Sequence, residues 1–478
     1  MSGLIGVSSS GSGGNKYNKL IISDFKECEK PTPSSISISY IAINNDNKPL
    51  QHFIIVDGIK QEITSYIDAD KINREFTYKI ENLKLGTSYN LQIEITDGID
   101  AVQSIILTLS TSVFKTIGVR VDESNQNPET CCTYIDNATG ISPATATSLG
   151  EWENRWPFNK IRIVGFKSGK VIKEIKKEDK TKYIDGTNVP TDVDVMVEIP
   201  KIYWNFTDIE NGYELKISNE KINNTYDCYA HKVGDIEKDF IYVGAYLGSL
   251  NSQYGTLKSI GDVMPINNKD LYNLRQYAYN NGKGYQLFNW FTFVLLQILY
   301  LIAYKNLNSQ KAIGMGYTCG NSTFTKTGWT KDKGFVYGEQ TGKEQMCFLG
   351  IEDLWGNMAQ WIDGIFFDNR YDITVTPDNK TFNDRGTGYK TVYDKLNTYF
   401  SGYISKTSHT NESGFFPVKC IGSNTTYYCG NSVVVYGYIA YLGAYYNSSK
   451  SSNIFSLNLN SDPSRSNYKT SRLCYLGE

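Results

Sequence analysis

Hydrophobic and polar residues alternate along the first quarter of the chain. Runs such as SISISYIAI and QHFIIV place an apolar side chain at every second position, which is the period of a strand with one buried face. The pairs Asp57-Gly58 and Asp97-Gly98 are typical of tight turns between such strands. We therefore expect a β-sandwich over residues 17–113, preceded by a flexible Gly/Ser leader over residues 1–16.

The pattern changes after this region. Residues 114–190 keep short alternating runs and predict a β-rich connecting domain, whereas residues 191–478 mix strands with one long apolar segment and predict an α+β domain. The apolar segment runs from Leu287 to Tyr304 and is interrupted by Asn289 and Gln297. Its length is marginal for a membrane span. A buried helix is the better interpretation, and we expect no membrane span.

Composition narrows the function classes. A net charge of -2 and a pI near 6.1 argue against nucleic acid or an anionic membrane surface as a partner. Nine scattered cysteines form no CxxC pair, so we expect reduced thiols, no structural metal and no cofactor. The chain contains 36 tyrosines, the side chain favoured in binding faces, although tyrosine is also frequent in proteins from AT-rich genomes.

One hairpin carries a recognisable pattern. A late strand of the predicted sandwich begins near Tyr89, and it is preceded by Leu83 and by Gly86-Thr87. This spacing resembles the fibronectin type III pattern, and the resemblance implies a tyrosine corner in which the Tyr89 hydroxyl bonds upstream backbone. The tryptophan usual in an early strand of that family is missing, so we expect an Ig/fibronectin III-like domain in the broader sense.

The connecting domain shows a second resemblance. It has a Gly-Val-x-Val-Asp run, then Asn-Pro-Glu, then Tyr-x-Asp, and it resembles a segment that precedes the receptor-binding part of phage tail proteins from Gram-positive hosts. The residues are Gly118, Val119, Val121, Asp122, Asn127, Pro128, Glu129, Tyr134 and Asp136. An alternative is that Asp122, Glu129 and Asp136 bind calcium, although their spacing fits no known loop.

The strongest motif lies in the C-terminal domain. Asp353, Gly356-Asn357 and Trp361 are followed by Gly443-Ala-Tyr-Tyr-Asn447 and by Ser471-Arg472-Leu473. In this order they resemble the formylglycine-generating branch of the C-type-lectin-like fold, which also contains variable receptor-binding proteins of phages. We interpret the motif as structural, because glycine permits a strained turn, asparagine bonds irregular backbone, and tryptophan fills space. The residues in this role are Asp353, Trp355, Gly356, Asn357, Trp361 and Arg472.

A catalytic role finds less support, so we expect a protein that is not an enzyme. Oxidases of the same branch use paired cysteines, but Cys420, Cys429 and Cys474 match no such pattern. A glycan hydrolase would need a carboxylate pair, and in the adjacent Glu352 and Asp353 the second belongs to the structural motif. The tripeptides of calcium-dependent sugar-binding lectins are absent from the sequence.

Tyrosines concentrate close to the end of the chain. Between Tyr427 and Ser449 they alternate with small residues, and in the phage proteins that the chain resembles this stretch forms the exposed ligand face. Half of them could instead line a strand against the core. The expected ligand-binding residues are Tyr438, Tyr441, Tyr445, Tyr446, Asn447 and Arg465.

The resemblance implies a recognition protein. We expect a phage tail or phage-tail-like particle to use this face to bind a bacterial surface receptor, either protein or glycan. Such a particle is assembled in the bacterial cytoplasm and acts outside the cell. The N-terminal part would contact other tail or baseplate proteins, and the chain would form a homo-oligomer, with a trimer as the family-based expectation. The alternatives are an enzyme of the formylglycine-generating-like branch, a surface glycan hydrolase, and a structural baseplate component.

Overall fold

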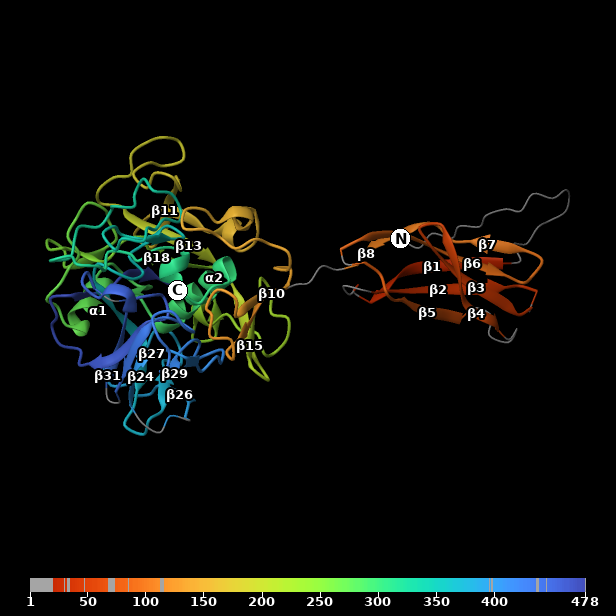
Figure 1. The fold of residues 1–478 in the computed structure, drawn as a ribbon. Helices are drawn as coiled ribbons and strands as arrows, with labels where there is room; N and C mark the ends of the chain where they lie inside the picture. The colour runs from red at the N-terminus through yellow and green to blue at the C-terminus, as the bar shows by residue number, and fades with distance from the viewer. Residues whose placement is uncertain are drawn as a thin grey trace. The chain divides into compact units, whose positions relative to one another are not determined.

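The computed structural model describes residues 20–29, 31, 35–46, 48–67, 74–84, 86–111, 116–394, 396, 399–435, 438–443 and 445–477. The chain divides into two compact units, unit 1 (residues 1–115) and unit 2 (residues 116–478), and each is described by itself. The expected leader over residues 1–16 lies outside the described residues. Both units are rich in strands, as the alternating pattern predicted (Figure 1).

The described strands of unit 1 form two antiparallel sheets. The three-stranded sheet has the order β1 (Leu20–Glu29), β2 (Ile36–Asn44), β5 (Arg74–Ile80). The other sheet has the order β4 (Ile59–Ile67), β3 (Leu50–Val56), β6 (Ser88–Thr96), β7 (Ala101–Gln103), with β8 (Leu107–Ser110) also paired to β6. Buried residues of both sheets, including Ile38, Ile54 and Leu91, form one core.

Tyr89 makes the contact that the sequence predicted. It opens β6 and is buried, and the backbone N–H of Lys84 donates to its hydroxyl oxygen at 2.7 Å. This hydrogen bond fixes the segment before β6, because it gives the Lys84 N–H an acceptor outside the sheet.

Replacing Tyr89 by phenylalanine is expected to destabilise unit 1 by about 1 kcal/mol, since one buried hydrogen bond is lost with little change in volume. Hydrogen exchange of the β6 amides measures the effect, because all seven tryptophans lie in unit 2 and their fluorescence does not report on unit 1. Tyr78→Phe is the matched control, since no hydrogen bond of its hydroxyl is found among the described residues. Equal exchange in the two variants would contradict the prediction.

Unit 2 is built on three larger sheets. The four-stranded sheet has the order β10 (Cys132–Asp136), β9 (Ile117–Asp122), β15 (Gly212–Ser218), β14 (Tyr203–Ile209). The six-stranded sheet has the order β12 (Lys170–Ile175), β11 (Arg162–Lys167), β13 (Asp194–Pro200), β18 (Phe240–Gly244), β34 (Leu473–Tyr475), β21 (Tyr285–Leu287). The eight-stranded sheet has the order β26 (Lys390–Tyr393), β25 (Ile373–Val375), β24 (Ala359–Phe367), β31 (Tyr438–Leu442), β32 (Leu457–Ser461), β30 (Asn431–Val434), β27 (Phe400–Tyr403), with β33 (Lys469–Thr470) paired to β24.

The described part of unit 2 also contains four short hairpins and several helices. The hairpins are β16 (Lys232–Val233) with β17 (Ile236–Glu237), β19 (Ser249–Asn251) with β20 (Thr256–Lys258), β22 (Cys347–Phe348) with β23 (Ile351–Glu352), and β28 (Lys406–Thr407) with β29 (Pro417–Lys419). The α-helices are α1 (Leu271–Tyr279), α2 (Trp290–Tyr304) and α3 (Ser309–Ala312). The 3-10 helices are η2 (Gly150–Asn154), η3 (Phe158–Lys160), η4 (Tyr229–His231) and η5 (Ser449–Ser451).

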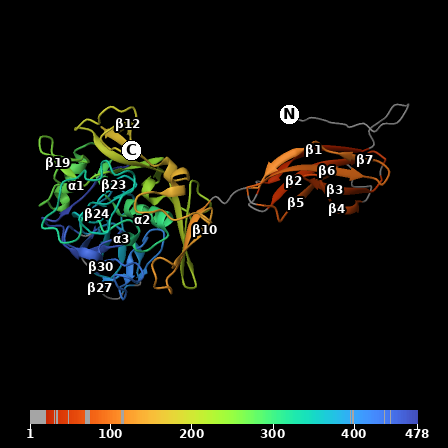
Figure 2. The same ribbon diagram turned by 45° about the horizontal axis from the view of Figure 1, so that its top comes forward.

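The long apolar segment forms the central helix of unit 2, as predicted. Every residue of α2 is buried, and in both ribbon views the helix lies inside the unit (Figure 1, Figure 2). Asn289 caps its N-terminus by accepting from the Thr292 N–H at 2.9 Å. The Gln297 side chain donates to the Ile454 carbonyl at 3.0 Å, which explains a polar residue in an apolar helix. Among the described residues, no helix has the length and apolar character to cross a membrane.

The expected boundary at residue 190 falls inside shared sheets. β9 pairs with β15 and β11 pairs with β13, so strands on either side of this position hydrogen-bond to each other. The C-terminal strand β34 lies in the same sheet as β13, between β18 and β21. Residues 116–478 therefore form one compact unit, and its last strand, β34, pairs with β18 and β21.

Candidate functional site

Residues 353–358 of the motif form a buried turn between β23 and β24, and Trp361 lies in β24. Asp353 and Asn357 adopt left-handed backbone conformations with φ of 56° and 59°, and Gly356 has a φ of 90°. A Cβ on Gly356 would lie 2.7 Å from the backbone nitrogen of Tyr317, so glycine is required there. The Asn357 amide donates to Asp353 Oδ2 at 2.8 Å and closes the turn on itself.

Asn357 also connects three neighbouring segments. Its side-chain oxygen accepts from the Thr325 N–H at 2.8 Å, and its own N–H donates to the Tyr317 carbonyl at 2.8 Å. Its carbonyl accepts from the Tyr446 N–H at 3.0 Å. The fixed turn thus sets the positions of the loops around residues 317, 325 and 446.

Arg472 is fully buried beside this turn. Its guanidinium donates to the carbonyls of Gly244 at 2.8 Å and Glu352 at 2.6 Å, and to Gln360 Oε1 at 3.1 Å. These acceptors belong to three different segments, so one side chain joins β18, β23 and β24. Burial lowers the pKa of Arg472 to about 10, which leaves it charged at neutral pH.

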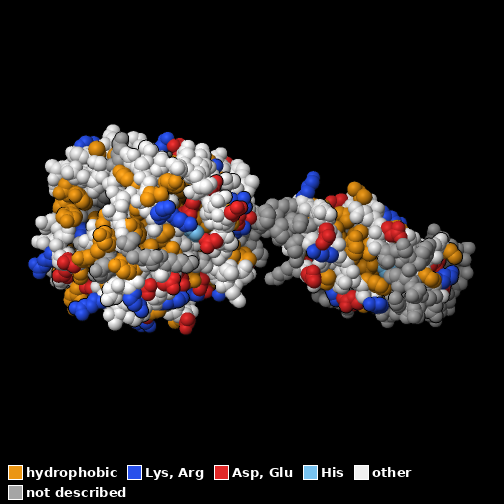
Figure 3. All heavy atoms as spheres, turned by 60° about the horizontal axis from the view of Figure 1, so that its bottom comes forward, with side chains coloured by type: hydrophobic (Ala, Val, Ile, Leu, Met, Phe, Trp, Pro, Cys, Tyr) orange, Lys and Arg blue, Asp and Glu red, His pale blue; other side chains and the backbone are white. Residues whose placement is uncertain are grey.

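Four tyrosines gather next to the motif and are called the tyrosine face: Tyr441, Tyr445, Tyr446 and Tyr468. The Tyr445 ring centroid lies 5.4 Å from that of Tyr446 and 5.0 Å from that of Tyr468. Tyr468 is 44% exposed and the other three are half-buried. On the side of unit 2 that carries the eight-stranded sheet in Figure 1, hydrophobic side chains form several groups among polar atoms (Figure 3).

Lys469 lies beneath the tyrosine face. Its Nζ is 4.4 Å from the ring centroid of Trp361 and 4.2 Å from that of Tyr441, with Tyr468 at 5.7 Å. Lys469 is 4% exposed, and burial lowers its pKa from 10.5 to about 8. The ring faces carry partial negative charge, so they stabilise an ammonium that water reaches poorly.

The expected ligand residues are only partly brought together. Tyr441, Tyr445 and Tyr446 lie in the tyrosine face, and Asn447 follows them on an exposed turn. Tyr438 pairs with Phe367 at the opposite end of β31, and Arg465 is exposed on the turn whose neighbour Ser466 bonds Asn268. Within the described chain, no ring contact joins Tyr438 to the tyrosine face.

Sequence reasoning missed Tyr468 and Lys469. The parallel pairing of β33 with β24 brings them to β31, and no local pattern announces such a pairing. From the sequence, Trp355 and Trp361 have the same predicted role, that of a tryptophan that fills space in the core. Trp355 donates its indole N–H to the Gly314 carbonyl at 3.0 Å, whereas the described residues offer the Trp361 indole no hydrogen-bond acceptor and its ring contacts Lys469.

The side chains considered for catalysis are inaccessible or poorly reactive. Burial raises the pKa of the Cys420, Cys429 and Cys474 thiols to about 12, so they are protonated at neutral pH. Glu352 and Asp353 are fully buried, and burial raises the pKa of both carboxyls. Glu352 accepts from the N–H groups of Gly328 and Thr330, each at 2.7 Å, which is a structural use of the carboxylate.

The acidic residues considered for calcium bind neighbouring protein groups. Asp122 accepts from the Ser124 N–H at 2.9 Å, Glu129 pairs with Lys311, and Asp136 pairs with Lys216 at 3.3 Å. Among the described residues, these three carboxylates do not belong to any cluster of side chains close enough together to bind one metal ion.

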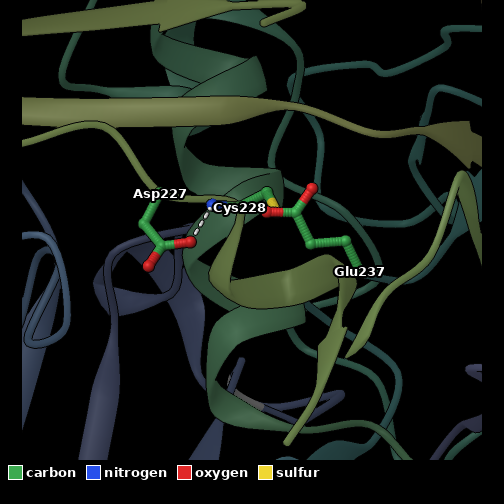
Figure 4. Close-up of side chains that lie close together, drawn as sticks. All are labelled: Asp227, Cys228 and Glu237. Atoms are coloured by element: carbon green, nitrogen blue, oxygen red, sulfur yellow. Dashed lines mark hydrogen bonds between the residues drawn. The ribbon is translucent and has the colours of Figure 1, made fainter. Parts of the chain in front are cut away.

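One described group does converge, formed by Asp227, Cys228 and Glu237 (Figure 4). The Asp227 carboxylate accepts from the Cys228 N–H at 2.7 Å and pairs with Lys232 at 2.5 Å. Glu237 accepts from the Tyr203 hydroxyl and lies 3.4 Å from Lys201. Burial raises the pKa of Cys228 to about 12. Both carboxylates are thus neutralised by protein cations, and the thiol is protonated.

No protein-family model and no curated protein matches this chain. Among solved structures, the chain is similar to the sensor domain of the anti-sigma factor RsgI4 from Pseudobacteroides cellulosolvens, with 14% sequence identity over 20% of this chain and 98% of that chain. The TM-score is 0.17, so this likeness supports no inference about fold or function.

Proposed function

We propose that this protein is the receptor-binding component of a phage tail or phage-tail-like particle and binds a bacterial surface protein or glycan through the tyrosine face. The observation that carries the proposal is the clustering of Tyr445, Tyr446 and Tyr468 around one another above a buried lysine. Tyrosine offers a large contact area with few rotatable bonds, together with a hydroxyl for hydrogen bonds. The sequence resemblance of residues 118–136 to phage tail proteins supports the setting.

The sheet orders support the finer fold assignment within this proposal. The β1-β2-β5 and β4-β3-β6-β7/β8 orders and the Tyr89 contact are those expected of an Ig/fibronectin III-like sandwich. In unit 2, the pairing of β34 with β18 and β21 and the buried Asp353–Asn357 turn are consistent with a C-type-lectin-like domain. On this proposal unit 1 contacts other tail proteins and unit 2 presents the receptor face.

We also propose that binding occurs without catalysis. The carboxyl groups of Glu352 and Asp353 are buried and therefore inaccessible to a glycan. Several copies of a weak site act together when they share one particle, so a homo-oligomer, such as a trimer, would raise the affinity for a repetitive surface.

Replacing Tyr445, Tyr446 and Tyr468 together by alanine is expected to reduce adsorption at least about tenfold, since contact aromatics contribute on the order of 2 kcal/mol when truncated. The measurement is binding of fluorescently labelled full-length protein to intact cells and purified walls from a panel of Gram-positive bacteria. Tyr254→Ala serves as the control, because this tyrosine is 67% exposed and belongs to the β19–β20 turn.

Two results would contradict the proposal. If the triple variant has wild-type tryptophan fluorescence and adsorbs as well as the wild type, the tyrosine face does not bind the receptor. Release of reducing sugar or of any cleaved product from the walls would show a catalytic protein instead.

A further inference from the structure

A recessed surface of unit 2, separate from the tyrosine face, lies on the loops around residues 325–333. It encloses a cavity of about 450 Å³ between these loops, Asp262, Tyr317 and residues 343–345. Trp329 lines it and is 51% exposed. All seven tryptophans of the chain are within the described residues, and Trp329 alone is exposed. An exposed indole in a recess offers a flat apolar surface to a ligand.

The lining of this pocket is richer in cations than in anions. Four lysines and three acidic residues line it: Lys326, Lys331, Lys333, Lys343, Asp262, Asp332 and Glu344. Lys331 lies 2.7 Å from both carboxylate oxygens of Asp262, and the Tyr337 hydroxyl donates to Glu344. The described residues provide Lys326 with no ion pair, and Lys333 Nζ lies 5.9 Å from the Trp329 ring centroid. Asp332 and Glu344 lower the positive potential there.

Trp329 is held in place from below. The backbone N–H groups of its two neighbours, Gly328 and Thr330, both donate to the buried carboxylate of Glu352 at 2.7 Å. Thr325, at the other end of the loop, is fixed by the Asn357 side chain. A loop restrained in this way loses little conformational entropy when a ligand binds to it.

We propose that this pocket binds a negatively charged saccharide, with the sugar ring on Trp329 and the carboxylate or phosphate group near Lys326 and Lys333. The aromatic ring packs against the apolar C–H face of a sugar, and two flexible ammonium groups match an anion as point charges. The pocket is distinct from the tyrosine face, although Asn357 anchors both through Thr325 and Tyr446. This inference does not require the tyrosine face to be a receptor site.

The proposal is tested by titrating the full chain with glucose, glucuronate and glucose 1-phosphate. Saturation-transfer NMR monitors the binding of each sugar. Both charged sugars are expected to bind more tightly than glucose, and the phosphate and carboxylate arms show which group is preferred. Trp329→Ala is expected to abolish all three signals. The double substitution Lys326→Ala with Lys333→Ala is expected to weaken only the charged sugars, about tenfold, which corresponds to about 1.4 kcal/mol.

The controls are Tyr254→Ala and Lys170→Ala, which change an exposed aromatic and an exposed lysine outside the pocket. Binding that survives Trp329→Ala, or absence of binding by all three sugars to the wild-type chain, would overturn the inference. The triple variant of the tyrosine face is expected to bind the sugars normally. If this variant no longer adsorbs to cells but still binds the sugars, the two sites act independently. The proposal for the tyrosine face and the proposal for the Trp329 pocket can then fail separately.

Discussion

Replacing Arg472 by methionine is expected to destabilise unit 2 by about 4 kcal/mol, or to prevent its folding. The substitution leaves the buried carbonyls of Gly244 and Glu352 without their donor. An unpaired buried polar group costs about 1–3 kcal/mol, and bonds from a charged donor are at the upper end. Urea unfolding followed by tryptophan fluorescence measures the change, because all tryptophans belong to this unit.

Two further variants keep this prediction testable if the methionine variant does not fold. Arg472→Lys retains the charge but cannot reach all three acceptors, so a smaller loss is expected. Arg465→Ala removes an exposed arginine from the turn before β33 and is expected to change the unfolding free energy by less than about 0.5 kcal/mol. A methionine variant as stable as the wild type would show that the Arg472 contacts add nothing.

Local patterns predicted the parts of this fold that depend on neighbours in sequence. Alternation in residues 36–44 and 50–56 indicated strands, and the Tyr89 spacing indicated a contact only five residues away. The apolar run after Leu287 predicted a buried helix because none of its faces is polar enough for solvent. The sequence also indicated that the Asn357 amide bonds a turn, and it donates to Asp353 Oδ2, four residues away.

The remaining features depend on contacts between distant segments. Arg472 reaches Gly244, 228 positions earlier, and no spacing in the sequence reveals such a bond. The expected boundary at residue 190 shows the same limit, because β11 pairs with β13 across it. Trp329 was not singled out, since an isolated tryptophan in a loop looks the same whether it is buried or exposed. The sequence singled out Tyr441 but could not place Lys469 against its ring.

The stability of unit 2 is expected to depend on pH through Lys469. Its pKa of about 8 in the folded chain is below its ordinary value of 10.5, because burial disfavours the ammonium form. Between these two pH values the unfolded chain binds the proton that the folded chain has released, so the stability of unit 2 rises with pH across this window. From pH 7 to pH 9.5, the unfolding free energy is expected to rise by about 2 kcal/mol relative to a Lys469→Met variant, which has no charge to lose.

The comparison with Lys469→Met isolates this lysine, because every other titrating group is common to both proteins. Trp361 and Tyr441 keep their places against a methionine side chain of similar length, so the variant tests charge more than packing. A difference in unfolding free energy that stays constant from pH 7 to pH 9.5 would mean that Lys469 keeps its proton throughout. If the difference does change as expected, the tyrosine face is positively charged from below at pH 7 and neutral above pH 9, and an anionic ligand would bind there more weakly at the higher pH.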